Sequence, residues 1–141
     1  MNYRHAFHAG NFADVVKHVA LALCLDRLNA KEAPYRYIDT HAGAGLYDLT
    51  SDEALRSPEW RDGVARVWEA ERGAPEAVRA ALAPWLNVIR GMNPARLREY
   101  PGSPLLAAEI MRRQDVLRLC ELHVESAAAL RLAIARDKRV K

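Results

Sequence analysis

The sequence is poor in cysteine and has no long apolar run, and both absences limit what the protein can be. No run of apolar residues approaches the roughly 20 that cross a membrane, and no apolar signal-peptide core follows Met1–His5. We therefore expect a cytoplasmic protein with no membrane partner. The two cysteines, Cys24 and Cys120, have apolar neighbours and no Cys-x-x-Cys spacing. We expect both to be buried thiols, because free cysteine behaves as a small hydrophobic residue.

Two common nucleotide-binding patterns are missing from the glycine-rich stretch His41–Gly45. It has neither the Gly-x-Gly-x-x-Gly order of a dinucleotide site nor the Lys-Ser/Thr ending of a P-loop. Instead, residues 35–39 predict a strand with Asp39 at its carboxyl end, and Gly43 and Gly45 allow a tight turn close to a bound molecule. An ordinary strand and turn of any α/β protein would give the same pattern, so this stretch alone leaves both interpretations open.

A helix is expected before this strand, beginning at the N-cap residue Asn11. The helical spacing of apolar residues predicts its core-facing side, which consists of Val16, Ala20, Leu23 and Leu28. Asp14 and His18 are four residues apart and share another side of the helix. They form either a surface pair or a polar side that faces the same crevice as the glycine turn.

Residues 49–98 are expected to form an all-helical insertion with a kink or break at Pro84. We expect it to pack on itself through Trp68, Leu82, Trp85 and Leu86. All basic residues of the insertion are arginines, and the arginine fork suits phosphate recognition. Acids are interspersed, however, so an ordinary mixed-charge surface is the alternative. The net charge of +3 is compatible with a nucleic-acid partner but does not require one.

The remaining sequence predicts further helices and strands of an α/β fold. A helix is expected from Ser103, as its N-cap, to about Arg113. It is followed by a strand over residues 116–122, a helix over 125–136 and the beginning of a third strand over 138–141.

Glu121 lies at the end of the predicted strand 116–122. An acid at the end of the strand that follows a glycine turn commonly binds the ribose hydroxyls of an adenine nucleotide. A surface acid at a strand end is the alternative. If Glu121 does bind ribose, one crevice holds Asp39, the Gly43–Gly45 turn, Ser103 and Glu121. Such a crevice suits a cofactor that contains adenosine.

Four blocks of sequence together carry a resemblance. They are His-Ala-Gly-Asn-x-Ala-Asp-Val-x-Lys-His at 8–18, Asp-Thr-His-Ala-Gly-Ala-Gly at 39–45, Tyr-Pro-Gly-Ser-Pro at 100–104 and Glu-Leu-His at 121–123. In these blocks the chain resembles the RlmJ family, bacterial 23S ribosomal RNA adenine-N(6) methyltransferases. The resemblance implies the α/β, Rossmann-like fold of class I S-adenosylmethionine-dependent methyltransferases, truncated here and with an inserted all-helical subdomain. The expected parts are the Rossmann-like domain at 1–48 and 99–141 and the helical insertion at 49–98.

The resemblance also implies a cofactor and a substrate. The cofactor is S-adenosylmethionine, and the substrate is the exocyclic amine of an adenine in 23S ribosomal RNA. Cofactor contacts are implied for the turn and for four side chains, at His18, His41, Gly43, Gly45, Ser103 and Glu121. Tyr3 matches a family position that contacts the RNA. We expect the protein to be a monomer.

One departure from the family is large, because the sequence contains no Pro-Pro. The family has an Asp-Pro-Pro-Tyr motif, whose Asp deprotonates the target amine and whose aromatic residue stacks on the target base. By resemblance this motif lies beyond Lys141, so no catalytic residue is expected in this chain, which should be inactive by itself.

Two other hypotheses remain from the sequence. The chain could be a nucleic-acid-binding protein involved in the use or catabolism of external DNA, without methyl transfer. The second alternative is a zinc site, for which the candidate ligands would be His5, His8, His18, His41 and His123. The sequence has no thiolate pair and no His-Glu-x-x-His helix, so no metal site is expected.

Overall fold

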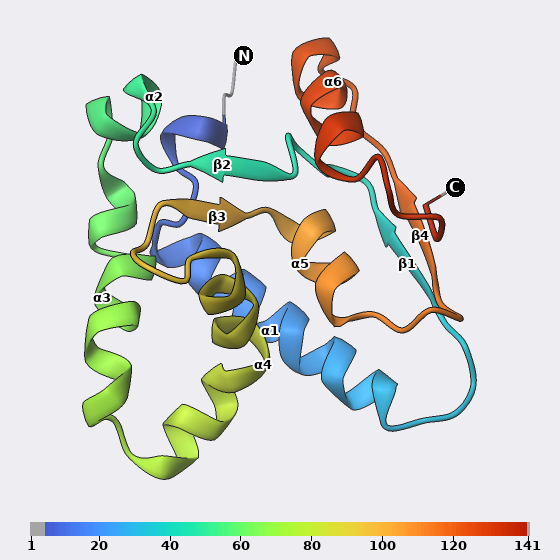
Figure 1. Ribbon diagram of the computed structural model, residues 1–141, viewed down its shortest axis with the longest axis horizontal. Helices are drawn as coiled ribbons and strands as arrows, with labels where there is room; N and C mark the ends of the chain where they lie inside the picture. Colours follow the sequence, from blue (N-terminus) through green and yellow to red (C-terminus); the bar gives the residue numbers. More distant parts are fainter. Residues whose placement is uncertain (1–4, 141) are drawn as a thin grey trace.

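The α/β part of the computed structural model contains two parallel strands, β1 (Arg36–Asp39) and β4 (Val116–Leu119) (Figure 1). The structure describes residues 5–140. Leu117 pairs with a residue of β1 and also forms an isolated parallel bridge with Val140. Because a strand pairs along both of its edges, β4 lies between β1 and the segment at Val140. The strands predicted at 35–39 and 116–122 are thus present, the second one shorter than predicted.

A second, antiparallel sheet lies at the base of the helical segment. It pairs β2 (Leu46–Asp48) with β3 (Glu99–Pro101), and Asp48 is opposite Glu99. The sequence analysis missed both strands, because each has three residues and lies beside turn-forming residues. Between them, the structure contains helices alone, which are α2 (Asp52–Arg56), α3 (Val64–Ala70), α4 (Glu76–Met92) and the 3-10 turns Glu59–Arg61 and Glu71–Gly73.

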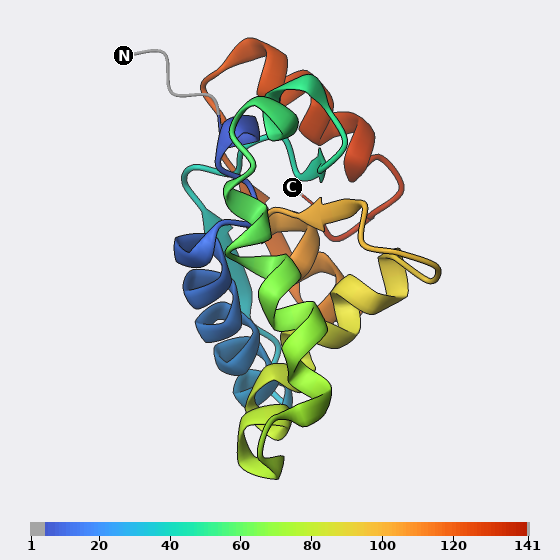
Figure 2. The same cartoon turned by 90° about the vertical axis from the view of Figure 1, so that its left-hand side faces the viewer.

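The other helices are α1 (Phe12–Asn29), α5 (Ser103–Ile110), α6 (Val124–Ala133) and a 3-10 turn at His5–Phe7. Asn11 is the N-cap of α1, as predicted, and its side chain accepts a hydrogen bond from the Asp14 amide at 2.9 Å. Helix α4 continues through Pro84 instead of ending there. Helix α1 packs against α4, and Figure 2 shows α1 (blue) alongside the green helix α3, with α6 (red) and α2 both at the top of the molecule.

The main hydrophobic core joins the helical segment to the rest of the protein. Trp85, Leu86 and Ile89 of α4 are buried against residues of α1, β3 and α5. We expected residues 49–98 to pack on themselves through Trp68, Leu82, Trp85 and Leu86, but Trp68 and Leu82 are only partly buried at the margin of this core. The buried side of α1 has small residues such as Ala22, which allow α4 to approach closely. The helical segment therefore shares its core with α1 and α5.

Helix α1 buries a different side from the one that we predicted. The exposed fractions of Val16, Leu23 and Leu28 are 67%, 40% and 37%, and Ala20 is exposed as well. The buried residues of α1 are Asp14, Val15, His18, Ala22 and Leu25. The helix has apolar residues on more than one side, so periodicity alone did not identify the side that faces the core.

The prediction for the two cysteines was also wrong, because Cys24 and Cys120 are both exposed. Cys24 lies on the outer side of α1, and Cys120 follows β4 at the edge of the site described below. Leu23 and Leu122 nearby are exposed as well, whereas Ala22 and Leu25 beside Cys24 are buried. Within residues 5–140, no helix is both long enough and apolar enough to span a membrane.

The start of α1 crosses the start of α3 at two glycines. The Gly10 carbonyl accepts a hydrogen bond from the Val64 amide at 2.8 Å. A Cβ atom on Gly63 would overlap the Gly10 carbonyl oxygen and would lie 2.5 Å from the Asn11 carbonyl carbon. The two backbones are therefore in direct contact, and only glycine fits at position 63.

We predict that Gly63→Ala lowers the free energy of unfolding by about 2–3 kcal/mol, because rigid backbone must move to admit the new methyl group. Gly91→Ala is the matched control, since nothing lies within 4 Å of a Cβ at that helical position. It should stabilise the protein by up to about 1 kcal/mol. Urea denaturation of both variants measures the difference, and equal effects would contradict the backbone contact.

Candidate functional site

Asp39 connects the end of β1 to the glycine turn and to α5. Its Oδ2 accepts hydrogen bonds from the Ser103 hydroxyl at 2.6 Å and from the Tyr37 hydroxyl at 2.9 Å. Its Oδ1 accepts a hydrogen bond from the His41 amide at 3.0 Å. We predicted that Ser103 caps α5, but the N-cap is Gly102 and Ser103 is the first residue of the helix. The Ser103 hydroxyl bonds to Asp39 instead of capping the helix.

The glycine turn has the conformation that its sequence predicts. Gly43 and Gly45 have φ angles of +67° and +83°, which L side chains rarely adopt. The Gly45 carbonyl accepts a hydrogen bond from the Gly102 amide at 2.8 Å, and a Cβ at position 45 would lie 3.0 Å from Leu130 of α6. Gly45 thus fixes the spacing between the turn, α5 and α6.

Glu121 closes the turn from the β4 side. Its Oε2 accepts a hydrogen bond from the Gly43 amide and its Oε1 accepts one from the His123 amide, each at 2.7 Å. The carboxylate is therefore held in place by backbone donors and is not an isolated surface acid. Each oxygen has a further lone pair that can accept another hydrogen bond.

Asp14 is a buried carboxylate that holds the residues before α1. It accepts hydrogen bonds from His5 Nε2 at 2.8 Å, the Gly10 amide at 3.0 Å and Lys17 Nζ at 2.7 Å. Burial opposes ionisation of Asp14, but the His5 contact and the Lys17 hydrogen bond outweigh it and hold the pKa of this carboxyl well below its usual range. The surface pair between Asp14 and His18 is thus ruled out, because both residues are buried.

His18 is buried beside Tyr100. Its exposed fraction is 1%, and its Nδ1 lies 2.8 Å from the Tyr100 hydroxyl. The two rings are stacked, with centroids 5.5 Å apart. Burial lowers the pKa of His18 to about 4, although the Asp14 charge acts in the opposite direction. At neutral pH the imidazole is therefore uncharged, and its Nε2 has no hydrogen-bond partner among the described residues.

These residues meet at one cavity of about 470 Å³. Five of the predicted site residues line it, namely His18, His41, Gly43, Ser103 and Glu121. Gly45 supports the turn but does not line the cavity, and Tyr3 lies outside the described residues. Other lining residues include Lys17, Tyr47 and Ser126, which the sequence analysis did not single out, and His5 and His123, which it named only as candidate zinc ligands. Lys17 lies in the first quoted sequence block, whereas nothing in the sequence identified Tyr47.

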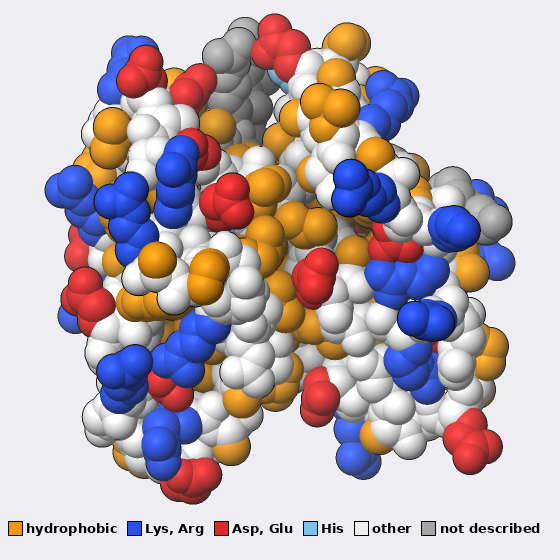
Figure 3. Space-filling view, in the orientation of Figure 1, with side chains coloured by type: hydrophobic (Ala, Val, Ile, Leu, Met, Phe, Trp, Pro, Cys, Tyr) orange, Lys and Arg blue, Asp and Glu red, His pale blue; other side chains and the backbone are white. Residues whose placement is uncertain are grey.

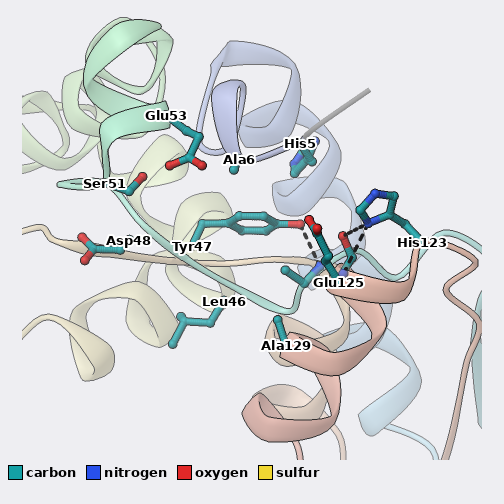
Figure 4. A pocket seen from close by; sticks show the side chains of 12 residues that line it. His5, Ala6, Leu46, Tyr47, Asp48, Ser51, Glu53, His123, Glu125 and Ala129 are labelled. Atoms are coloured by element: carbon teal, nitrogen blue, oxygen red, sulfur yellow. Dashed lines mark hydrogen bonds between the residues drawn. The ribbon is translucent and has the colours of Figure 1, made fainter. Parts of the chain in front are cut away.

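A smaller pocket of about 280 Å³ adjoins this cavity (Figure 4). The two share Tyr47, His5, His123 and Ser126. Figure 4 shows the Tyr47 ring across the pocket, and its hydroxyl accepts a hydrogen bond from the Ala44 amide at 3.1 Å. Tyr47 thus separates the two spaces and supports the glycine turn from the side of β2. Among residues 5–140, no cluster of three or more His, Cys, Asp or Glu side chains could hold a metal ion.

Comparison with known proteins identifies the family. Residues 32–141 match the family described as "Ribosomal RNA large subunit methyltransferase D, RlmJ". The chain belongs to the RlmJ family. It is 43% identical to "Ribosomal RNA large subunit methyltransferase J" of Escherichia coli (strain K12), over 100% of this chain and 49% of the relative. The protein of the same name from Haemophilus influenzae is 42% identical, over 99% of this chain and 49% of its own length.

A solved structure also resembles this chain. It is the crystal structure of protein LPL1258 from Legionella pneumophila str. Philadelphia 1, of family DUF519. The TM-score is 0.83 at 37% identity, over 94% of this chain and 47% of that protein. The chain therefore spans about half the length of the relatives that it matches. The resemblance noted in the four sequence blocks is confirmed, and the fold is a mixed α/β fold shared with this neighbour.

We predict that stability falls as the pH decreases from 6.5 to about 4, because burial depresses the pKa of His18 in the folded state. Below its unfolded pKa, His18 binds a proton in the unfolded chain but not in the folded one, so acid favours unfolding. The loss amounts to up to about 3 kcal/mol. Urea denaturation across this pH range measures it. His18→Gln should reduce the dependence of the unfolding free energy on pH. His123→Gln, at an exposed position, should leave that dependence unchanged. The same pH dependence in both variants would show that His18 is not its source.

Proposed function

We propose that this chain is the cofactor-binding half of a class I, Rossmann-like methyltransferase domain that uses S-adenosylmethionine. In this proposal, residues 1–48 and 99–141 belong to that domain and residues 49–98 are a helical insertion. The parallel pairing of β1, β4 and Val140 supports the assignment. The pairing of Asp48 with Glu99 also supports it, because the insertion then begins and ends at neighbouring positions.

The observation that carries the proposal is the convergence of His18, His41, Gly43, Ser103 and Glu121 on one cavity. The residues fit the chemistry of the cofactor. Glu121 retains lone pairs for two ribose hydroxyls, and Gly43 has no side chain to block approach to its backbone. His18 has an unpartnered buried ring nitrogen, which a polar ligand atom would satisfy.

We propose that the substrate is the exocyclic amine of an adenine in 23S ribosomal RNA, encountered in the cytoplasm by a monomeric enzyme. The family and the names of both relatives support a ribosomal RNA substrate. When bound, the cofactor supplies an electrophilic methyl group on a sulfonium. The role of this chain is to hold and orient that group, and Tyr3 is assigned to RNA binding by resemblance.

Methyl transfer also requires groups that this chain does not supply. The lone pair of an adenine amine is delocalised into the ring, so the amine must be aligned with the methyl group and deprotonated. The base must also be displaced from its helix to reach the site. In our proposal the Asp-Pro-Pro-Tyr motif performs these steps, and the sequence has no Pro-Pro. Asp39 and Glu121 are already bonded to the turn.

The second hypothesis, binding of external DNA without methyl transfer, gains no specific support. Figure 3 shows Lys and Arg side chains over the helical segment, but acidic side chains lie among them. Two of its arginines pair with acids of the same segment, Arg79 with Glu76 and Arg90 with Glu71. The charge pattern is therefore that of a mixed surface, and the cavity favours a cofactor-dependent enzyme.

We predict that Glu121→Ala weakens S-adenosylmethionine binding by about 1–3 kcal/mol, the order expected for hydrogen bonds to a charged group. Isothermal titration calorimetry measures the affinity. Glu109→Ala is the control, because Glu109 is an exposed acid of α5 outside the cavity. Equal affinities of Glu121→Ala and the unmodified chain would remove Glu121 from the ribose site.

We predict that this chain binds the cofactor but transfers no methyl group alone. A hybrid of the Escherichia coli relative, with its matching half replaced by this chain, should methylate 23S ribosomal RNA, because the missing groups are then supplied. A radiolabelled methyl-transfer assay on protein-free RNA compares the 141-residue chain with the hybrid. Turnover by the 141-residue chain would mean that it contains the catalytic residue. Labelling of DNA but not RNA by the hybrid would overturn the substrate assignment and leave the cofactor assignment standing.

A further inference from the structure

The pair formed by His18 and Tyr100 connects α1 to the middle of β3 inside the protein. Tyr100 is completely buried and His18 nearly so, and His18 Nδ1, at 2.8 Å, is the acceptor available to the Tyr100 hydroxyl among the described residues. His18 lines the cavity, whereas Tyr100 lies behind it. Tyr100 therefore cannot touch a ligand in the cavity but can act on one through His18.

The hydrogen bond can be arranged in two ways, because a neutral imidazole carries one proton. If His18 Nδ1 donated it, the Tyr100 hydroxyl proton would be buried without an acceptor, which is costly. If the hydroxyl donates to Nδ1, both groups are satisfied and the imidazole proton lies on Nε2. Burial keeps His18 neutral and raises the pKa of Tyr100 well above its usual value, so both protons stay in place at neutral pH.

The part of the cavity near α1 and α5 favours an anion over a cation. Lys17 and Asp14 both line it as an ion pair, and the Asp14 carboxylate is already bonded by His5 and Gly10, so the donors that remain there are the Lys17 ammonium and the backbone. Gly102 and Ser103 place the N-terminus of α5 at the same cavity, and helix N-termini attract negative charge. In contrast, Glu121 comes from the end of β4 and suits hydroxyl donors.

We infer that Tyr100 is a positioning residue that fixes the tautomer of His18, so that Nε2–H donates a hydrogen bond to the carboxylate of the methionyl group of S-adenosylmethionine. This inference rests on the cofactor assignment proposed above. It also requires that the ligand carry a carboxylate, because His18 would recognise that group. It also gives the tyrosine of the Tyr-Pro-Gly-Ser-Pro block a function separate from that of Ser103.

The test compares two ligands that differ only in the carboxylate, S-adenosylmethionine and decarboxylated S-adenosylmethionine. Tyr100→Phe should weaken binding of the first on the order of tenfold, as for one hydrogen bond to a charged group. Its effect on the second should be less than about twofold. Tyr35→Phe is the matched control, since it removes a tyrosine hydroxyl that bonds to Asn29 and lies outside the cavity. Calorimetry gives the affinities, and circular dichroism checks that each variant folds.

Nitrogen-15 NMR of the His18 imidazole provides a readout that needs no ligand. In the unmodified chain the proton should lie on Nε2, and in Tyr100→Phe the ring should become a mixture of tautomers. A proton on Nδ1 in the unmodified chain, or an equal loss of affinity for both ligands, would overturn the inference. If the unmodified chain binds neither ligand, the cofactor assignment itself is wrong. The inferred role of Tyr100 in binding the cofactor is then wrong as well.

Discussion

The carboxylate of Asp39 holds together the three elements that form the site. It accepts hydrogen bonds from Tyr37 on β1, from the backbone of the turn at His41 and from Ser103 at the start of α5. Without it, the end of the strand, the turn and the helix would have no common polar contact at this point. Its place at the carboxyl end of a parallel strand is where α/β sheets bind ligands. Both oxygens of this carboxylate are thereby bonded within the site.

Glu121 repeats this arrangement from the neighbouring strand and makes the turn a closed unit. It reaches Gly43 and His123 through backbone amides, so the turn is bonded to the ends of both β1 and β4. On the opposite side, Asp14 and His18 introduce buried polar groups into α1, and burying such groups is unfavourable unless they find partners. Asp14 has three partners, but His18 Nε2 has none among the described residues. The indole nitrogens of Trp60 and Trp85 are also buried without a partner there, but of the three residues only His18 lines the cavity, which is consistent with a site that is completed by a ligand.

The parts of this structure that depend on local sequence were predictable, and those that depend on distant contacts were not. Asn11 as a cap and the conformation of Gly43 follow from residue type at one position. The role of Ser103 was missed because its hydroxyl bonds to a carboxylate 64 residues away. Strands β2 and β3 were missed because three-residue strands have no periodic signal and form only when their partners meet. From their positions at strand ends and helix starts, we predicted that His18, His41, Ser103 and Glu121 line one cavity. Tyr47 also lines it, but it belongs to β2, a strand that was not predicted.

The errors on α1 and on the cysteines have a common physical cause. Phe12 and Val16 on α1 and Ile38 on β1 are 73%, 67% and 59% exposed, although their sequence patterns are those of buried residues. A helix with apolar residues on two sides is typical of one that packs against two layers, and in the described residues only one of these sides is covered.

β1 also has a free edge, because its described pairing is with β4 alone. In the Rossmann-like fold that we propose, further strands continue the sheet from that edge. The relatives are about twice as long as this chain. The apolar residues of α1 are divided between two sides of the helix. The buried side carries Asp14 and His18, which line the candidate cavity, whereas Val16 and Leu23 lie on a side that the described residues leave exposed.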